Sequence, residues 1–472
     1  MRKLHLNAVL ASGALVLGSL TTVTALTGAA SASTTTCDPS QLSKASGTIN
    51  ITFEESMAGG AFSGFKGNKD YLADLIAAYN SSQSKVHVTD LNDAGGYTDT
   101  WQKYLADLSN GSGAPQVVMF DQYDAQAAQD TQSVLPISSC LSADKSFSEK
   151  TFLPKATTAY TINGSQVGMP FSVSTPVMYY NLQAFAKAKI KSAPTTMAQL
   201  IADEALLQKS GEKNGVAIKK DPWLTMTWLG MADQPFVNNG NGHLGRASSV
   251  SFNNSTAQQY WTAIQTLVKN GALATGTTGS ITQAYANLFA VANGLAAITF
   301  DTTAALGSIQ NALPLFKTVT LGVAPLPTLT GKSTGATPPG GNGLFIPKSN
   351  SPAQTAAAWD FIKYLSSATS DGTWAAHTGY IPIRTDAVTK WKSLQSKQAV
   401  AWYTVAYDGI LKGKSDNSTA GPVIGDYATV SNELVTALDG LTQSPWPSAA
   451  SLLTTAQNAA NTDLASYNSR LP

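Results

Sequence analysis

Apolar positions in the first third of the chain alternate between the period of a strand and the period of a helix. A short run rich in β-branched residues over 48–53 predicts a strand. Four apolar residues then recur at the spacing of one helix face: Leu72, Leu75, Ile76 and Tyr79. The alternation continues with a strand over 85–91, a helix over 98–108 and a buried strand over 116–120. This pattern predicts an α/β fold with a parallel sheet covered by helices.

The rest of the chain divides into two kinds of segment. The pattern over 148–294 is mostly helical, whereas short strands near 296–300 and 344–347 resemble the first third again. Ser351 and Pro352 supply an N-cap and a first-turn proline for a further helix, and the pattern stays helical to the end. We expect two lobes with these boundaries: 48–158 and 296–348 for lobe 1, and 159–295 and 349–472 for the mostly helical lobe 2.

The first 32 residues have the pattern of an export signal. Arg2 and Lys3 precede an apolar, uncharged stretch over 8–26, and Ala30-Ser31-Ala32 is a small-x-small pattern that a signal peptidase cleaves. A retained membrane anchor is the alternative that the length and flanks of this stretch favour less. We therefore expect a signal peptide over 1–32, an N-terminal tether over 33–47, and a secreted chain outside the cytoplasmic membrane.

The charge balance excludes partners that are bound mainly by electrostatics. The full chain has 30 basic and 29 acidic residues, a net charge of +1; without Arg2 and Lys3 the balance is 28 to 29, or −1. Such a chain has no excess charge with which to attract nucleic acid or an anionic membrane. The three arginines that follow the signal are Arg246, Arg384 and Arg470.

The chain has two cysteines, Cys37 and Cys140. In an oxidising compartment an even pair usually forms a disulfide, so we expect these two to be bridged. Two free buried thiols are one alternative. Lipid attachment at Cys37 is another, but 34–36 is a run of threonines where an acylation signal needs apolar and small residues.

Compact catalytic motifs are missing from the sequence. His87, His243 and His377 are far apart and lack the spacing of a zinc site, and there is no nucleophile elbow or phosphate-binding loop. The adjacent carboxylates Glu54 and Glu55 leave open a secreted glycan hydrolase or lyase. Because adjacent strand residues point to opposite faces, a solvated turn or a ligand-accepting role is favoured. We expect no enzyme activity, no metal site and no cofactor.

Four segments of the chain form an ordered set: 169–181 (MPFSVSTPVMYYN), 340–347 (GGNGLFIP), 357–365 (AAWDFIKYL) and 378–383 (TGYIPI). In order and approximate spacing, this set resembles the family 1 extracellular solute-binding proteins of ABC importers, and most of all their glycerol-3-phosphate-binding branch. The resemblance implies a two-lobe, periplasmic-binding-protein-like α/β fold. It also implies hinge strands between the lobes and a ligand held in the inter-lobe cleft.

The resemblance also implies which residues contact ligand. The matching positions are Tyr97, Asp121, Ser174, Thr302, Thr303, Gly341 and Tyr380. Asp121 is shorter than the glutamate of the family, the two threonines replace serines, and Gly341 would let ligand approach backbone N–H groups. Trp223 and Trp228 lie near the family's stacking indole; they do not share a helix face, so we expect one platform and one core residue.

One departure from the family concerns the ligand. Val423 in 421–425 (GPVIG) stands where the family has an arginine that grips phosphate, and valine cannot donate hydrogen bonds to an anion. We therefore expect an uncharged, sugar-like ligand, with a glycerol-3-phosphate or glycerophosphodiester ligand as the alternative. The predicted function is capture by hinge closure, as a monomer, and delivery to the permease subunits of an ABC transporter. A surface adhesin is a further alternative.

Overall fold

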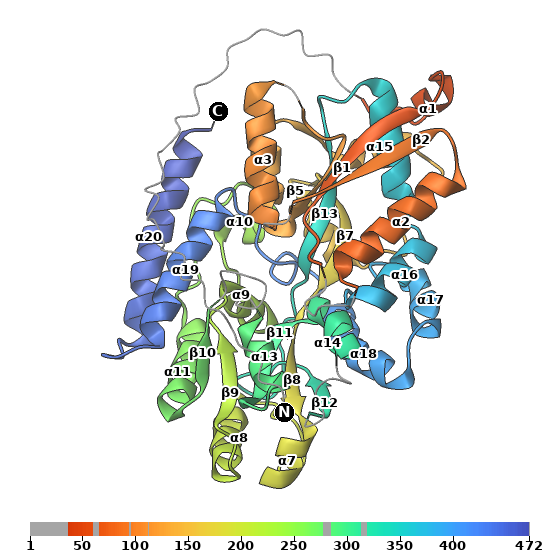
Figure 1. Cartoon of the computed structure of the whole chain (residues 1–472). Coiled ribbons are helices and arrows are strands. Elements are labelled where there is room, and N and C mark those ends of the chain that lie inside the picture. Colours follow the sequence, from red (N-terminus) through yellow and green to blue (C-terminus); the bar gives the residue numbers. More distant parts are fainter. Residues whose placement is uncertain are drawn as a thin grey trace, which may run out of the picture. The chain divides into compact units, whose positions relative to one another are not determined.

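The computed structural model of the chain describes residues 36–471 except 60–65, 94–95, 112, 277–284 and 313–318. The predicted signal peptide over 1–32 lies outside these residues. Two sheets organise the described part, and each carries its own helices. Figure 1 shows them one above the other, with β1 and β13 in the upper sheet and β8, β9 and β11 in the lower.

The first sheet has the strand order β2-β1-β3-β13-β4, and β7 pairs with β13. Its strands are β1 (Ile49–Glu55), β2 (Val86–Asn92), β3 (Val117–Asp121), β4 (Val134–Leu135), β7 (Met169–Ser174) and β13 (Gly340–Pro347). β1 is parallel to β2 and to β3, as the alternating pattern predicted, whereas β13 is antiparallel to β3. Helices α2 (Asn68–Ser82), α3 (Tyr97–Asn110) and α15 (Pro352–Leu365) pack against it.

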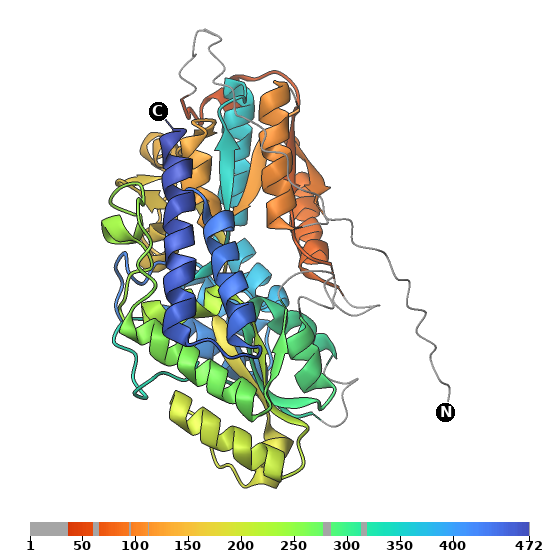
Figure 2. The same ribbon diagram turned by 90° about the vertical axis from the view of Figure 1, so that its left-hand side faces the viewer.

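The second sheet has the strand order β10-β9-β11-β8-β12. Its strands are β8 (Pro176–Asn181), β9 (Asn214–Lys219), β10 (Leu273–Thr275), β11 (Ala296–Thr302) and β12 (Leu321–Ala324). Its helices include α8 (Met197–Lys209), α9 (Pro222–Met231), α11 (Ser255–Asn270), α13 (Ala286–Ala292), α18 (Lys397–Leu411), α19 (Tyr427–Leu441) and α20 (Ala449–Ser469). Figure 2 shows α19 and α20, in blue, side by side and next to α11.

Short elements complete the described part of the fold. The other α-helices are α1 (Gln41–Lys44), α4 (Ala125–Asp130), α5 (Ile137–Ala143), α6 (Pro154–Thr158), α7 (Leu182–Ala188), α10 (Asn238–Asn241), α14 (Leu306–Ala312), α16 (Ala368–Thr378) and α17 (Val388–Ser393). The 3₁₀ turns η1 (Gln122–Asp124), η2 (Thr303–Ala305) and η4 (Thr385–Ala387) and the hairpin β5 (Thr161–Ile162) and β6 (Ser165–Gln166) lie between them. Within the described residues, every helix is too short or too polar to cross a bilayer.

Local sequence explains where the helices begin. Leu72, Leu75, Ile76 and Tyr79 are the buried residues of α2, which confirms the predicted face. Ser351 caps α15, with its side chain accepting from the backbone N–H of Gln354, and Pro352 occupies the first turn as predicted.

Two chain crossings join the sheets. β7 ends at Ser174 and β8 begins at Pro176, so the single residue Thr175 separates a strand of the first sheet from a strand of the second. The chain returns through 325–339, between β12 and β13. These crossings are the counterparts of the hinge strands that the family resemblance implied.

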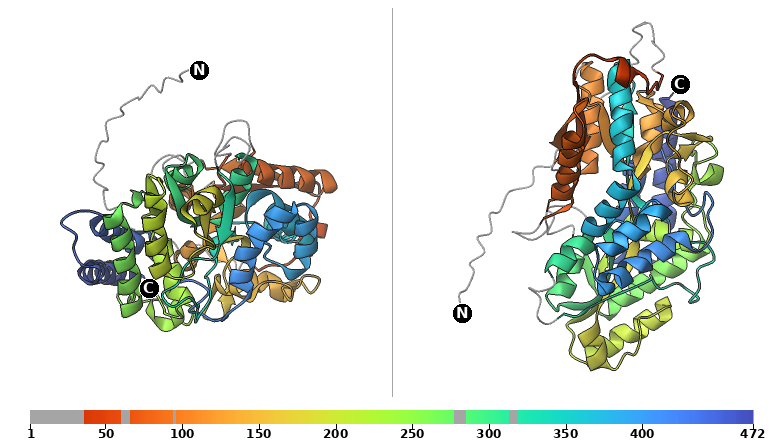
Figure 3. Two further views of the ribbon diagram at one scale, coloured as in Figure 1. Left: turned by 90° about the horizontal axis from the view of Figure 1, so that it is seen from below. Right: turned by 90° about the vertical axis from the view of Figure 1, so that its right-hand side faces the viewer.

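The sheet membership corrects part of the predicted lobe boundaries. Of the segment 296–348, only β13 joins the first sheet, because β11 and β12 both pair with β8 in the second. Conversely, α15 lies in the range assigned to lobe 2 but packs on the first sheet, where Phe361 meets Phe53 with ring centroids 5.5 Å apart. Figure 3 shows α15 to α18, cyan to blue, leading from the first sheet toward the second. Hydrophobic periodicity identifies a strand or a helix but does not say which sheet it joins.

The start of the described chain is fixed rather than tethered. Cys37 and Cys140 form a disulfide with their Cα atoms 4.9 Å apart, as the sequence predicted. Cys37 is buried, and α1 packs against α15. Cys37, Leu42 and Ala45 therefore anchor this segment to the hydrophobic core of the first sheet, which corrects the expected tether over this part of 33–47.

We predict that the disulfide stabilises the fold mainly by restricting the unfolded chain. It joins residues 103 positions apart, and closing a loop of this length contributes about 2–5 kcal/mol to stability. Cys37→Ser combined with Cys140→Ser should lower the free energy of unfolding in urea by this amount. Dithiothreitol should cause the same loss in the wild-type protein and none in the double variant; equal unfolding curves for all of them would contradict the prediction.

Candidate ligand-binding site

Polar and aromatic residues from both sheets meet where several strands end. Asp121 is the last residue of β3, and Asp221 follows the end of β9 by two residues. The two carboxylates lie close enough to repel each other, and the ring of Tyr123 stacks on Tyr427 of α19 with centroids 4.3 Å apart. In α/β sheets ligands bind beyond the carboxyl ends of the strands. We therefore place the candidate site around Asp121.

Asp121 is held on a network of side chains from the first sheet. Its Oδ1 accepts a hydrogen bond of 3.0 Å from the backbone N–H of Tyr123. Asn342 of β13 is its partner across the sheet, and the Asn342 amide donates to the Tyr97 hydroxyl at 2.8 Å. The Tyr380 hydroxyl lies beside that of Tyr97. The family resemblance implied Tyr97, Asp121 and Tyr380 as ligand contacts, and the structure brings these three side chains together; the resemblance did not include Asn342.

Burial governs the electrostatics of this network. It raises the pKa of Asp121 to about 7, against the opposing effect of the Tyr123 N–H, and the charge of Asp221 raises it further. Five phenols lie within the electrostatic reach of Asp121: Tyr97, Tyr123, Tyr160, Tyr380 and Tyr427. Burial is the main cause that raises the pKa of each phenol, so all of them keep their protons at neutral pH. The site therefore offers neutral hydroxyl groups around an acidic centre.

The second sheet contributes a partly exposed indole to the site. Asp221 caps α9 by accepting from the backbone N–H of Trp223 at 2.9 Å, and Pro222 occupies the first turn. The Trp223 ring lies over the backbone of Gly340, where an added Cβ would come within 2.4 Å of the ring. Trp223 is partly exposed, and its Nε1–H makes a hydrogen-bonding contact with the Tyr123 hydroxyl. Such an indole can stack on a ligand through its ring.

Trp228 is a core residue, as one of the two tryptophans was expected to be. Its side chain is buried, its Nε1–H donates to the Pro327 carbonyl at 3.2 Å, and its ring stacks on Tyr260 with centroids 4.9 Å apart. The proposal of Trp228 as a ligand platform is therefore corrected.

Three other predicted positions serve the backbone around the crossings. The Thr303 hydroxyl is buried and accepts from the N–H of Thr175 at 3.3 Å, while the Thr302 hydroxyl accepts from the N–H of Ala304 at 3.0 Å. Ser174 is buried in β7 opposite Gly340. Among the contacts of the described residues, none joins Thr302, Thr303 or Ser174 to Asp121.

Gly341 has a different role from the one expected. Its φ is +129°, and a Cβ at this position would come within 1.9 Å of the Ser172 carbonyl oxygen. The missing side chain therefore allows β13 to pair with β7, which is a packing reason and not evidence of ligand approach.

One cation belongs to the second-sheet side of the site. Lys219 Nζ lies 3.5 Å from Asp221 and 3.7 Å from Asp301. Burial alone would lower the pKa of Lys219, but the charges of Asp301 and Asp221 outweigh it and raise the pKa. Asn287 also donates to Asp301 at 2.9 Å. The charge of this lysine is therefore already balanced by two carboxylates.

The arginines of the described chain are engaged elsewhere. Arg384 pairs with Asp386 at 2.7 Å, Arg246 pairs with Asp130 at 2.7 Å, and Arg470 lies over the Tyr467 ring. Val423, at the position of the family's arginine, is buried in the core that contains Tyr160. The site therefore lacks the guanidinium that would hold a phosphate in a bidentate manner.

The two candidate catalytic carboxylates are part of the structure of the first sheet. Glu54 accepts from Lys103 at 2.8 Å, and Glu55 accepts from Asn92 at 2.6 Å. Burial raises the pKa of both carboxyls to about 7. Both side chains are fully buried, which corrects the expectation of a solvated turn. Within the described ranges, no group of three or more His, Cys, Asp and Glu side chains is placed to hold a metal ion.

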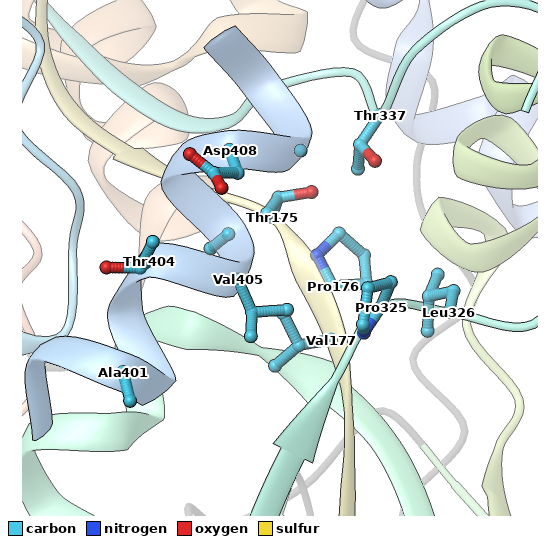
Figure 4. Close-up of a pocket in the computed structure, with 12 residues that line it drawn as sticks. Thr175, Pro176, Val177, Pro325, Leu326, Thr337, Ala401, Thr404, Val405 and Asp408 are labelled. Carbon is cyan, nitrogen blue, oxygen red and sulfur yellow. The ribbon is translucent and has the colours of Figure 1, made fainter. Parts of the chain in front are cut away.

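A separate hollow of about 390 Å³ lies beside the crossing at Thr175 (Figure 4). It is lined by Thr175 to Val177, by both ends of the return crossing and by α18. Its walls are mostly apolar, and Asp408, the one acid that lines it, is paired with Lys412 at 2.6 Å. The volume suits a small molecule, but the convergent polar groups that fix a hydrophilic ligand are found around Asp121 instead.

The family is shown by comparison with known proteins. The family model described as bacterial extracellular solute-binding protein matches residues 74–401, and the chain belongs to this family. The sn-glycerol-3-phosphate-binding periplasmic protein UgpB of Yersinia pestis is 25% identical over 329 residues, which cover 67% of this chain and 71% of that protein. The chain is thus a solute-binding protein of ABC importers, and this family is one of binding proteins rather than enzymes.

Solved structures agree on the fold. The GacH receptor of Streptomyces glaucescens, solved unliganded and with acarbose, superposes with a TM-score of 0.69 at 17% identity, covering 90% of this chain and 98% of that one. UgpB from Mycobacterium tuberculosis, solved with glycerophosphocholine, superposes with a TM-score of 0.67 at 19% identity, covering 89% and 99%. At these identities the likeness shows the two-lobe fold and leaves the ligand open.

We predict that Asp121 makes stability depend on pH. Its pKa is raised from 3.8 to about 7 by folding, so its contribution to stability is fully present below pH 4 and is lost as the pH rises through about 7. Asp121→Asn keeps the oxygen that accepts from Tyr123 but removes the charge. Its stability relative to wild type should rise between pH 5 and pH 8 by on the order of 2 kcal/mol.

Chemical denaturation at the two pH values measures this change. Glu54 and Glu55 titrate in both proteins, so their effect cancels in the difference. Asp408→Asn, which removes a half-exposed charge paired with Lys412 on α18, is the matched control and should show the same difference from wild type at both pH values. A constant difference for Asp121→Asn would contradict the prediction.

Proposed function

We propose that this protein captures a small, hydroxyl-rich, carbohydrate-like ligand around Asp121 and delivers it to the permease subunits of an ABC transporter. The observation that supports this most is the meeting of Asp121 and its tyrosines with Trp223 from the other sheet. Hydroxyl ligands need convergent donors and acceptors, and a sugar ring needs a flat apolar surface to stack on. Tyr97, Tyr380 and Asp121 would hydrogen-bond the ligand, and Trp223 would stack on it.

Capture would proceed by movement at the two crossings. Thr175 and the segment 325–339 are the covalent links between the sheets outside the last helices, so rotation there would bring the two halves of the site together. A ligand that contacts both halves binds the closed form better than the open form and shifts the population toward it. The closed form would be the one that a permease recognises.

A phosphorylated ligand is the second candidate. The names of the curated relatives favour glycerol-3-phosphate, and one of the similar structures holds glycerophosphocholine. Against it stand Val423 in the place of an arginine, the engagement of Arg246 and Arg384 elsewhere, and the repulsion that Asp121 and Asp221 would exert on a phosphate. Lys219 alone, already neutralised, is a poor substitute.

The setting of this activity follows from the sequence. We propose export by the signal over 1–32 and action as a monomer outside the cytoplasmic membrane, with no nucleic-acid partner and no cofactor. The two lobes would be the halves built on the two sheets, with 48–158 and 159–295 each contributing most of one sheet. Membership of an extracellular family supports this location.

We predict that sugars or polyols, and not glycerophosphodiesters, stabilise the purified protein. A ligand at ~100 times its dissociation constant adds about 2.7 kcal/mol to stability, which thermal-shift screening detects easily. X-ray scattering should show a smaller radius of gyration with the same ligand, because the lobes close. A shift caused only by glycerophosphodiesters would favour the second candidate, and release of product from a glycan would contradict the binding function.

The two tryptophans provide a matched pair of variants. Trp223→Ala should weaken binding of a ligand found by the screen by at least about tenfold, because it removes a stacking surface, with little change in ligand-free melting. Trp228→Ala should instead cost about 3–5 kcal/mol of stability, because it empties a core site. Calorimetric titration and melting of both variants measure these effects. An equal loss of stability in both would mark Trp223 as a core residue.

A further inference from the structure

The carboxylates of the candidate site are not balanced by cations. Asp121 and Asp124 lie near each other, and Asp221 lies near Asp121 from the other sheet. No cation of the described chain lowers the pKa of Asp121 or Asp124. Lys219 is shared by Asp221 and Asp301, and it does not offset Asp121 or Asp124; burying acidic groups without a cation is unfavourable.

A buried acceptor beside Asp121 also lacks a hydrogen-bond donor. Asn342 is fully buried and stands opposite Asp121 in register, so the two side chains share one face of the sheet. Its Nδ2 donates to Tyr97, which leaves Oδ1 as an acceptor without a partner. The Tyr123 hydroxyl is likewise buried, lies near both Asp121 and Asp221, and makes a hydrogen-bonding contact with the side chain of Trp223. The buried Asn342 oxygen that has no donor thus points to a ligand at this place.

Because the site presents acceptors and acidic groups, we expect a ligand group that has several hydrogen-bond donors and a positive charge. A carboxylate and an amide oxygen accept only, and a sugar hydroxyl supplies one donor, whereas an ammonium group supplies three. Aromatic rings also attract a cation through their faces, and Tyr123 and Tyr427 form a stacked pair beside the carboxylates. The acidic groups of the site, the number of donors that its acceptors need and its aromatic rings all favour an ammonium group on the ligand.

We propose that the ligand is an aminated carbohydrate whose protonated amine binds between Asp121 and Asn342, with its ring on Trp223. This inference rests on the proposed function and narrows its ligand class. The amine would donate to the Asp121 carboxylate and to the Asn342 amide oxygen. The Tyr123 hydroxyl would bond a neighbouring ligand group. The charge of the ligand would offset the repulsion between Asp121, Asp124 and Asp221, so that closure of the two halves becomes favourable only when it is bound.

The test compares ligands that differ only in this group. The probes are glucosamine, galactosamine, mannosamine and β-1,4-linked glucosamine oligomers of two to four residues, each beside the parent sugar that has a hydroxyl in place of the ammonium. Titration calorimetry of the full-length mature protein at pH 7 should show binding of at least one aminated probe. Its parent should bind at least about tenfold more weakly, the size expected for one charge-assisted hydrogen bond.

Two variants assign the preference to its residue. Asp121→Asn should bring the aminated probe and its parent to within about threefold of each other, because the amine loses its countercharge but the shape of the site is kept. Asp74→Asn removes an exposed carboxylate on α2 and should keep the full preference. Melting of each ligand-free variant confirms that it is folded, and the wild-type comparison holds even if one variant is not.

The other outcomes overturn the inference in distinct ways. Equal or better binding of the parent sugars would leave a sugar-binding function and reject the amine. Binding of glycerophosphocholine alone would assign the carboxylates to a choline group attached to phosphate and would reject both the amine and the preference for sugars. Absence of binding by every probe and every parent sugar would reject this inference together with the proposed ligand class. A preference that survives Asp121→Asn would place the amine elsewhere.

Discussion

The arrangement of the two sheets depends on one covalent connection, in which a single residue joins a strand of the first sheet to a strand of the second. β7 and β8 are separated by Thr175 alone, so the chain passes from one sheet to the other without an intervening loop. Thr175 and Thr303 hold this point through two hydrogen bonds, one to the Thr303 hydroxyl and one from the Thr303 N–H. The ends of β3, β9 and β11 are brought near each other because the sheets are tied here.

The position of the site follows from this tie, and its chemistry follows from burial. Asp121 and Asp221 come from separate sheets, yet the charge of Asp221 raises the pKa of Asp121 because the crossing brings their strand ends together. Burial is the main cause that raises the pKa of Asp121, because a carboxylate that is removed from water is costly to ionise.

The sequence predicted secondary structure well and assembly less well. The buried face of α2, the start of α15 and the disulfide between Cys37 and Cys140 were predicted from spacing, capping residues and cysteine number, and all are present. The sheet that β11 and β12 join was predicted wrongly, because a strand's apolar pattern records burial and not its neighbour. Family resemblance named Tyr97, Asp121, Tyr380 and Trp223, but it also named Gly341 and Trp228, which serve packing.

What the sequence determined by itself is local: the elements, their caps, the scarcity of arginine and the valine at position 423. What only the tertiary structure decided is which side chains share a space. Asn342 lies beside Asp121 because β13 returns antiparallel to β3, and Tyr427 stacks on Tyr123 although 304 residues separate them along the chain, from 123 to 427. Distance along a chain does not limit distance in a fold, so the charge excess around Asp121 exists only once burial and strand pairing have brought these groups together.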